Sequence, residues 1–440
     1  MKNTHLLAIY RIGLLVVLFG VVLHAPLSVW LSSLWPDYTE LIKAWKEILL
    51  FGLAVIAVIL LTKEREWRRL LRVRLVQLSI GFILLHLLLL PVFWQGLAPS
   101  VAGLMIDLRF IAVFLLFYAL TLLDPGALRS LVKTTAVGAV IIVGFGLLQI
   151  TVLPDDFLAR FGYSKTTITP YSTIDKNPDF VRINSTTRGP NPLGAMSVVY
   201  VSLLLAWLVY RWRRLSVTWR LWTASGIFAT LAVMFASFSR SAYMALIASM
   251  GISGALASKV STKYLFVGLS VTVVAGLAGV GLLGSSDWFA NVVLHEDPES
   301  VVIEKSNPAH IASLEEGVNR LAKQPLGAGI GSTGSAVLYG VQGGPTIENY
   351  YLFVAHEAGW LGLATFMAIV ILVLKELYHR RDSWLGVALF ASGIGLAIIG
   401  LLLPVWTDDT TSITWWALVG GIIGSSYAKR TRQQEATRTT

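Results

Sequence analysis

Long apolar blocks alternate with short polar segments along most of the chain. Each block has about 17–25 residues, which is the length that an α-helix needs to cross a bilayer. The first block starts near Leu6, is too long for a signal-peptide core and lacks a small-x-small cleavage site. The pattern predicts an all-α polytopic membrane protein with twelve transmembrane helices. The spans cover residues 6–26, 40–61, 75–95, 100–123, 131–153, 191–210, 220–238, 241–257, 264–284, 349–374, 384–403 and 412–427.

Basic residues collect in every second loop of this plan. Six lie in loop 62–74, and further ones lie in loops 211–220, 258–263 and 375–383 and in the C-terminal tail. The short intervening loops have no Lys or Arg; they are 27–39, 91–99 and 404–411. Because cytoplasmic loops carry the excess of Lys and Arg, both termini are predicted to be cytoplasmic.

Two long polar segments then fall on the outer side. Residues 154–190 follow the fifth span, and residues 285–348 follow the ninth. Both are too polar to lie in lipid, and loops of this length are usually functional or disordered. The chain is therefore predicted to form one membrane domain over residues 1–440, with a periplasmic or extracellular cap made by these two loops.

Composition agrees with this picture and excludes several classes of function. Hydrophobic residues make up 55% of the chain and charged residues only 14%, which excludes an ordinary soluble enzyme. The net charge of +10 follows from the basic cytoplasmic loops, so no nucleic-acid partner is predicted. There is no cysteine, which excludes disulfides and thiolate chemistry. Because Asp408-Asp409 is isolated in a short loop, neither a metal site nor a cofactor is predicted.

Two arginines are predicted to lie at the outer face. Arg188 opens the motif Arg188-Gly-Pro-Asn-Pro-Leu-Gly194 at the entry to span six, and Arg240 is the charge in the short connection between spans seven and eight. A guanidinium is a planar fork of donors that suits phosphate oxygens. The pair is thus a candidate diphosphate clamp, although interfacial arginines also reach for lipid headgroups.

A third motif, Pro345-Thr-Ile-Glu348-Asn349-Tyr-Tyr, opens span ten. Glu348 there is a candidate general base for a hydroxyl, and the alternative is an ordinary first helical turn capped by Asn349. His310, on a helical segment of the second long loop, is a second candidate catalytic residue, and the alternative is a solvated surface histidine. The run Pro325-Leu-Gly-Ala-Gly-Ile-Gly331 is predicted to be a tight turn near the site, because no strand precedes it as in a dinucleotide-binding motif.

Charged residues inside the spans are a further sign of function, because charge within a membrane is costly. They lie in the outer halves of spans two and four and are Lys43, Lys46, Glu47, Asp107 and Arg109. Their spacing allows Lys43 to pair with Glu47, whereas Asp107 and Arg109 point to different sides and need other partners. A cavity that opens outward accounts for this distribution. The residues assigned to it are Asn191, Arg109, Lys46 and Asn349.

The order and spacing of these motifs resemble those of the O-antigen ligase and polymerase superfamily of bacterial envelope glycosyltransferases. The likeness covers most of the chain and is strongest from Asp179 to Gly362. The motifs that carry it are Arg188-Gly-Pro-Asn-Pro, Ser239-Arg240, Pro325-Leu-Gly-Ala-Gly-Ile-Gly, Glu348-Asn349-Tyr-Tyr-Leu and Glu357-Ala-Gly-Trp-Leu-Gly.

The resemblance implies a GT-C-like enzyme at the outer face of the bacterial cytoplasmic membrane. Such proteins transfer a glycan, without a metal and with inversion, from a polyprenyl-diphosphate carrier to a hydroxyl of a lipid- or glycan-linked acceptor. Arg188 and Arg240 would hold the diphosphate, and Glu348 would be the base. Ligases for the lipopolysaccharide core are expected to carry histidine in place of Glu348, so lipid A core, a growing polymer and a protein side chain all remain open as acceptors. An arginine expected near His310 is missing, and Arg320 or Lys323 could substitute for it.

Two other classes of membrane protein fit parts of the pattern. A transporter or flippase of lipid-linked oligosaccharides would also have twelve spans, but it usually shows two related halves and polar sites at the midplane. A peptidoglycan glycosyltransferase of the shape-elongation type would use the same carrier with a different motif set. The sequence favours the ligase or polymerase reading because its polar motifs gather at the outer face.

Overall fold

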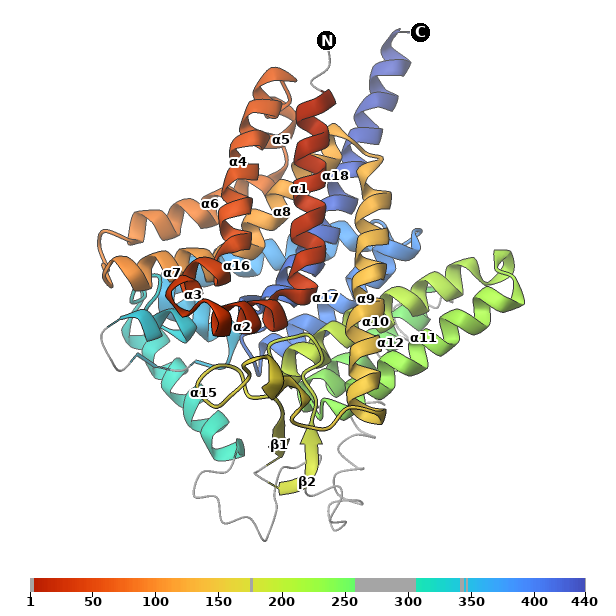
Figure 1. Cartoon of the computed structure of the whole chain (residues 1–440). Coiled ribbons are helices and arrows are strands. Elements are labelled where there is room, and N and C mark those ends of the chain that lie inside the picture. The colour runs from red at the N-terminus through yellow and green to blue at the C-terminus, as the bar shows by residue number, and fades with distance from the viewer. Residues whose placement is uncertain (1–3, 175–176, 258–305, 341–343, 346, 440) are drawn as a thin grey trace.

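The computed structural model describes residues 4–174, 177–257, 306–340, 344–345 and 347–439, and these residues are mostly α-helical (Figure 1). The predicted span 264–284 and the first part of the loop 285–348 lie outside the described residues. The helices of the N-terminal half are α1 Thr4–Gly20, α2 His24–Leu34, α3 Thr39–Lys43, α4 Trp45–Lys63, α5 Trp67–Leu71, α6 Arg74–Leu89, α7 Leu97–Asp107, α8 Arg109–Leu123 and α9 Ala127–Thr151. Those that follow are α10 Pro190–Arg211, α11 Val217–Ala236, α12 Arg240–Ala257, α15 Ser306–Lys323, α16 Tyr350–Tyr378, α17 Trp384–Gly400 and α18 Asp409–Thr439.

Several of these helices have the length and apolar character of membrane spans. Six described segments meet both conditions, and α7 with α8 makes a seventh if this pair, bent by 47°, is one span. Two more apolar helices, α6 and α17, are shorter. The structure thus confirms a largely α-helical chain built like a multi-pass membrane protein, while the count of twelve spans stays a prediction.

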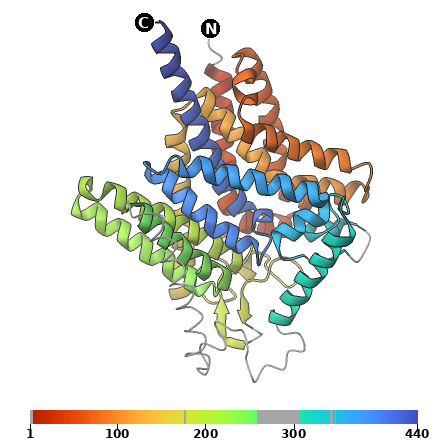
Figure 2. The same cartoon turned by 180° about the vertical axis from the view of Figure 1, so that it is seen from behind.

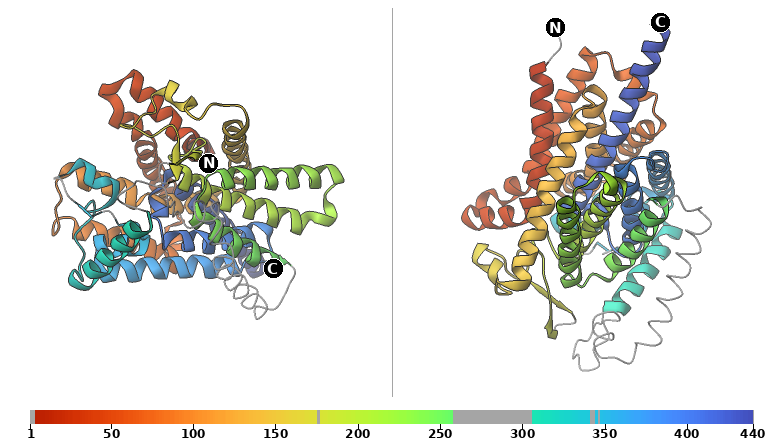
Figure 3. Two further views of the ribbon diagram at one scale, coloured as in Figure 1. Left: turned by 90° about the horizontal axis from the view of Figure 1, so that it is seen from below. Right: turned by 90° about the vertical axis from the view of Figure 1, so that its right-hand side faces the viewer.

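The long helices run in two main directions. Figure 1 shows α1, α4, α9 and α18 upright, with α10, α11 and α16 running across them. The view from behind shows the same crossing for α16, in light blue (Figure 2), and the side view shows the green helices α10 and α11 nearly end-on (Figure 3). Helices in both directions cannot all follow one membrane normal, so which of them span a bilayer has to be judged from the charges of their loops.

The centre of the molecule is the packing of α18 against α8. Almost every residue of α8 is buried, and Trp416 of α18 lies 5.0 Å from the ring of Phe110, measured between centroids. Glycines let the two backbones approach, as small residues do between membrane helices: a Cβ on Gly420 would lie 2.5 Å from the carbonyl oxygen of Phe114. This contact holds the start of α18, and the aspartates beside it, at the centre of the fold.

A second close contact brings the start of α10 to the start of α12. A Cβ on Gly194 of α10 would lie 2.7 Å from that of Ala242 and 2.8 Å from that of Ser239. Only a glycine at this position permits such an approach. The packing therefore places the segments that carry Arg188 and Arg240 side by side.

The segment that leads into α10 is tied firmly to its surroundings. Strands β1 Ser172–Ile174 and β2 Asn177–Arg182 form an antiparallel pair, and a buried stretch follows. In that stretch Asn184 donates to the carbonyl of Thr169 at 2.8 Å, and Ser185 donates to the carbonyl of Ile142 at 2.6 Å. Arg188 thus projects from an anchored backbone.

Candidate functional site

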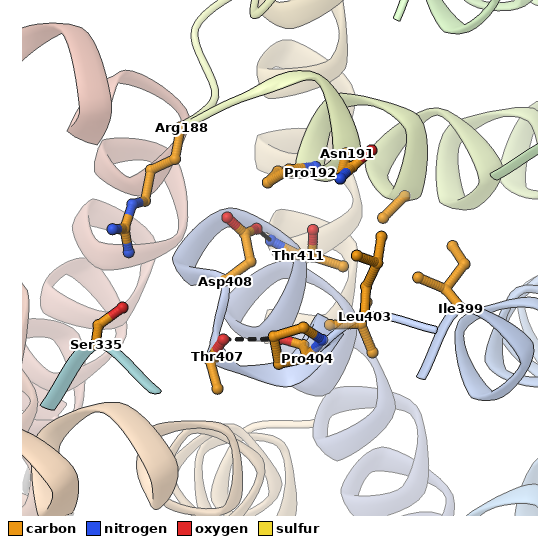
Figure 4. Close-up of a pocket in the computed structure, with 12 residues that line it drawn as sticks. Arg188, Asn191, Pro192, Ser335, Ile399, Leu403, Pro404, Thr407, Asp408 and Thr411 are labelled. Carbon is orange, nitrogen blue, oxygen red and sulfur yellow. Dashed lines mark hydrogen bonds between the residues drawn. The ribbon is translucent and has the colours of Figure 1, made fainter. Parts of the chain in front are cut away.

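A cavity of about 260 Å³ lies where three segments meet (Figure 4). They are the start of α10, the short 3₁₀ helix η6 Gly334–Tyr339, and the connection from α17 to α18, which contains η7 Val405–Thr407. The residues that line it are Arg188, Asn191, Pro192, Ala195, Ser335, Ile399, Leu403, Pro404, Val405, Thr407, Asp408 and Thr411. The cavity combines an apolar floor with a few polar groups, as ligand sites commonly do.

Arg188 is the cation of this cavity. Its side chain extends into the space between Ser335 and Asp408 (Figure 4). Within the described residues it makes neither a hydrogen bond nor an ion pair, so all five of its N–H donors remain available. Pro190 starts α10 directly after it, because the missing N–H of proline costs nothing in a first helical turn.

Asp408 and Thr411 form another wall of the cavity. The Asp408 carboxylate caps α18: its Oδ1 accepts a hydrogen bond from the backbone N–H of Thr411 at 2.8 Å. The other oxygen, Oδ2, is buried and has no hydrogen-bond partner among the described residues, and the same holds for Oγ1 of Thr411. Buried polar atoms in folded proteins are nearly always bonded, so two of them on one cavity wall need an explanation.

Arg182 links the segments of the two predicted clamp arginines. Its Nε donates to the carbonyl of Ser237, just before Arg240, at 2.9 Å, and its second terminal nitrogen donates to Oδ1 of Asn191 at 2.8 Å. Burial, together with the charge of Arg240, lowers the pKa of Arg182 to about 10, so it stays charged at neutral pH. Arg188 lines the cavity, whereas Arg240 begins α12 beside Arg182 and is not among the lining residues. The sequence analysis missed Arg182, and its place in a polar loop offered no distinguishing signal.

Lys46 and Arg109, which the sequence analysis assigned to an outward cavity, form a buried ion-pair network instead. Lys46 lies 3.3 Å from both Glu47 and Asp409. The Nε atom of Arg109 lies 3.0 Å from Glu47, and its guanidinium also pairs with Asp409. None of these four side chains is more than 10% exposed. The two cations and two anions neutralise one another in the interior.

His24 completes this network and was not singled out in the sequence. The indole N–H of Trp45 lies 3.1 Å from Nδ1 of His24, and because an indole nitrogen only donates, Nδ1 must accept. The other ring nitrogen, Nε2, lies 3.0 Å from both Asp409 and the ammonium nitrogen of Lys46. Asp409, which looked isolated in the sequence, is thus the common partner of three side chains.

The spacing of charged residues predicted one ion pair wrongly, Lys43 with Glu47, and predicted correctly that Asp107 and Arg109 have different partners. Lys43 pairs with Glu40 at 3.1 Å rather than with Glu47, because α3 ends before α4 begins and Glu47 turns to the buried network. Asp107 and Arg109 do point to different partners, as their spacing predicted. The carboxyl of Asp107 lies beside that of Glu357, whereas Arg109 pairs with Glu47 and Asp409.

The glycine run 325–331 forms a tight turn, as predicted, and it packs into a break in α16. Three of its glycines have positive φ angles, and Gly359 of α16 has a φ of 65° inside the helix. Backbone N–H groups of the turn donate to the carbonyls of His356 and Glu357 at 2.6 and 3.0 Å. The backbone N–H of Gly331 donates to Oε1 of Glu357 at 2.9 Å. The turn thereby positions η6, which lines the cavity.

In the motif at the start of α16, Asn349 has a structural role, and the structure assigns no role to the side chain of Glu348. Asn349 caps the helix: its Oδ1 accepts from the backbone N–H groups of Tyr351 and Leu352 at 2.9 and 3.0 Å, which is the capping role weighed as the alternative. Glu348 is half-buried, and its backbone N–H donates to Ser313 of α15 at 3.2 Å. Neither residue is among those that line the cavity. His310 lies in α15, and its side chain is outside the described residues.

The predicted site residues therefore separate into three places. Arg188 and Asn191 share the cavity with Asp408, while Lys46 and Arg109 lie in the buried network. No protein-family model matches the chain, and no curated protein matches it either. The chemistry of the cavity is accordingly the basis for assigning a function.

Proposed function

We propose that the protein is a glycosyltransferase of the O-antigen ligase or polymerase type. It would move a glycan, without a metal, from a polyprenyl-diphosphate carrier to a hydroxyl of a lipid- or glycan-linked acceptor. The observation that carries the proposal is Arg188, an arginine without a hydrogen bond or ion pair in the described structure, which extends into a cavity that also contains a carboxylate.

The arginines suit the charge that leaves in such a reaction. When the bond between sugar and phosphate breaks, negative charge develops on the diphosphate. Arg188 can donate two hydrogen bonds to phosphate oxygens. Arg182, which donates to the cavity residue Asn191, and Arg240, whose charge acts on Arg182, add positive charge to the same region. Donors held ready in a water-poor site contribute several kcal/mol to such a transition state, about 2.7–4 kcal/mol for a single donor.

The size of the cavity limits what it can hold. Its volume of about 260 Å³ lies just below the range of about 300–1,000 Å³ that is typical of small-molecule pockets. It suits the reacting sugar and the adjoining phosphate, while the lipid tail and the remainder of the glycan extend outside.

The position of the cavity also agrees with the predicted topology. Its walls come from the end of segment 154–190, from segment 285–348 and from loop 404–411. The charge alternation in the sequence assigns all three to the outer side. We therefore keep the cytoplasmic termini and the site at the outer face of a bacterial cytoplasmic membrane as part of the proposal, whereas the two directions of the long helices leave fewer than the twelve expected spans among the described residues.

A flippase for lipid-linked oligosaccharides is the second candidate, because two apolar segments are broken. The pair α7–α8 bends by 47°, and α16 is interrupted at Gly359. Discontinuous helices frame the substrate sites of many transporters. A flippase would move the carrier-linked glycan across the membrane without breaking its bond to phosphate.

Reconstituted protein separates the two candidates. Proteoliposomes would be supplied with a radiolabelled polyprenyl-diphosphate oligosaccharide, with lipid A core or the same lipid-linked glycan as acceptor. We expect wild type to release polyprenyl diphosphate and to form a new glycosidic bond. Arg188→Ala should lower kcat/KM about 100-fold, the loss typical of one transition-state donor. The matched control is Arg160→Ala, an exposed arginine of the same loop, which should leave the rate unchanged.

Two results would contradict the proposal. One is wild-type transfer that Arg188→Ala does not reduce. The other is labelled glycan that crosses the vesicle membrane while still joined to its carrier, with no product from any acceptor, which would favour the flippase.

A further inference from the structure

The cavity wall formed by Asp408 and Thr411 contains two buried polar atoms without a hydrogen-bond partner among the described residues. Asp408 is held in one orientation, because its Oδ1 accepts from the N–H of Thr411 at 2.8 Å and its backbone carbonyl accepts from the N–H of Ser412 at 3.1 Å. These bonds leave Oδ2 as the free acceptor of the carboxylate. It is buried and without a hydrogen-bond partner within the described residues.

Thr411 presents a second unsatisfied atom in the same cavity wall. The residue is fully buried, with 0% exposure, and its Oγ1 has no hydrogen-bond partner in the part of the chain that the structure describes. Figure 4 shows that this hydroxyl points toward Pro192 and Asn191, across the cavity from η7. An incoming hydroxyl group could donate to Oδ2, and Oγ1 could bond to another oxygen of the same acceptor. A carboxylate and a hydroxyl in one cavity wall therefore suit an alcohol as ligand.

The charges divide the cavity into two functional halves. A diphosphate is attracted to Arg188 and repelled by Asp408, so the anionic leaving group belongs at the arginine. An uncharged hydroxyl has no such restriction and gains from the carboxylate. Arg188 and Asp408 both line this one cavity. A binding place for the leaving diphosphate and one for the acceptor hydroxyl therefore adjoin each other.

We propose that Asp408 is the general base for the acceptor hydroxyl and that Thr411 binds another oxygen of the same acceptor. This inference rests on the proposed function. The carboxylate takes the hydroxyl proton as the acceptor oxygen bonds to the anomeric carbon. The bond between that carbon and the phosphate oxygen breaks, and its electron pair leaves with the diphosphate beside Arg188. The proton then passes from Asp408 to water.

This assignment differs from the sequence-based prediction that Glu348 is the base. Glu348 is not among the residues that line the cavity. A general base must be within hydrogen-bond reach of the proton that it removes. In the described structure Asp408 lies on the cavity wall across from the leaving-group arginine, and Glu348 does not.

The test compares transfer with binding of the carrier alone. Full-length protein in nanodiscs would be assayed for glycan transfer, as above, and for binding of radiolabelled polyprenyl diphosphate that carries no glycan. Asp408→Asn is expected to keep the cap of α18, because Asn caps helices as well as Asp does. It should lower single-turnover transfer about 100-fold or more, which is the usual share of a general base. Binding of the carrier should stay equal or become tighter, because a like charge is gone.

Three further variants sharpen the comparison. Thr411→Val, which removes the hydroxyl with little change of shape, should raise KM for the acceptor more than it lowers kcat. Asp408→Glu should restore part of the activity lost in Asp408→Asn. Asp156→Asn, at an exposed position, should behave as wild type in both assays.

The outcomes distinguish this inference from the proposed function. Transfer by Asp408→Asn at a rate near wild type would overturn it, and so would a loss of carrier binding equal to that of Arg188→Ala. If Glu348→Gln abolishes transfer while Asp408→Asn does not, the base is Glu348. If wild type binds the carrier but transfers no glycan to any acceptor, the proposed function fails and this inference fails with it.

Discussion

Replacing Asp409 by Asn removes one charge from the buried ion-pair network. In the wild type, Lys46 and Arg109 are balanced by Glu47 and Asp409. The variant leaves two cations against one carboxylate in a site where no side chain is more than 10% exposed. Breaking a buried pair by removing one partner typically costs about 3–5 kcal/mol, because an uncompensated charge remains in the interior. We expect a loss of this size in the free energy of unfolding.

The measurement is chemical unfolding of the purified protein in bicelles, followed by circular dichroism. The double variant Asp409→Asn with Arg109→Gln restores neutrality and should recover about 1–3 kcal/mol relative to the sum of the single losses. Asp156→Asn is the matched control and should change stability by less than about 0.5 kcal/mol. A loss below about 1 kcal/mol for Asp409→Asn, or strictly additive effects in the double variant, would refute the reasoning.

Two further predictions concern helix α16, its kink at Gly359 and its cap at Asn349. Gly359→Ala should destabilise the fold by about 2 kcal/mol or more in the same unfolding assay, because φ is 65° and the new Cβ would meet the carbonyl oxygen of Pro325. The control is Gly144→Ala, at an ordinary helix position where a new Cβ would have no neighbour within 4 Å. This variant should stabilise the fold by about 0.5–1 kcal/mol. Asn349→Ala should lower stability by about 1 kcal/mol through loss of the α16 cap, and Asn349→Asp should lose less. A loss of transfer in Asn349→Asp at unchanged thermal midpoint would instead place this residue in the substrate site.

Much of the helical framework follows from the hydrophobic pattern. A helix satisfies all its backbone hydrogen bonds within one segment, so a long continuous apolar run in lipid is expected to be helical. The expected spans 131–153, 191–210 and 220–238 accordingly agree within a few residues with α9, α10 and α11. The break at residue 108 and the kink at Gly359 were not visible in the pattern, because apolar residues continue across both.

The candidate site was only partly accessible to sequence reasoning. Arg188 and Asn191 stood out because a charge and an amide lie in a turn motif before an apolar run. Asp408 did not, since two aspartates in a short loop are common. The surroundings of the two aspartates distinguish them. The packing of α18 on α8 places Asp409 among buried cations and Asp408 in the cavity wall.

By itself, the sequence determined where most of the described helices lie, that the chain is built for a membrane, and that Lys46, Arg109 and Asp107 need partners inside an apolar interior. These properties depend on neighbours within one helix or loop. Only the tertiary structure decided which partners they have. The choice depends on how distant helices cross, and a buried charge takes the opposite charge that this crossing brings within about 3 Å.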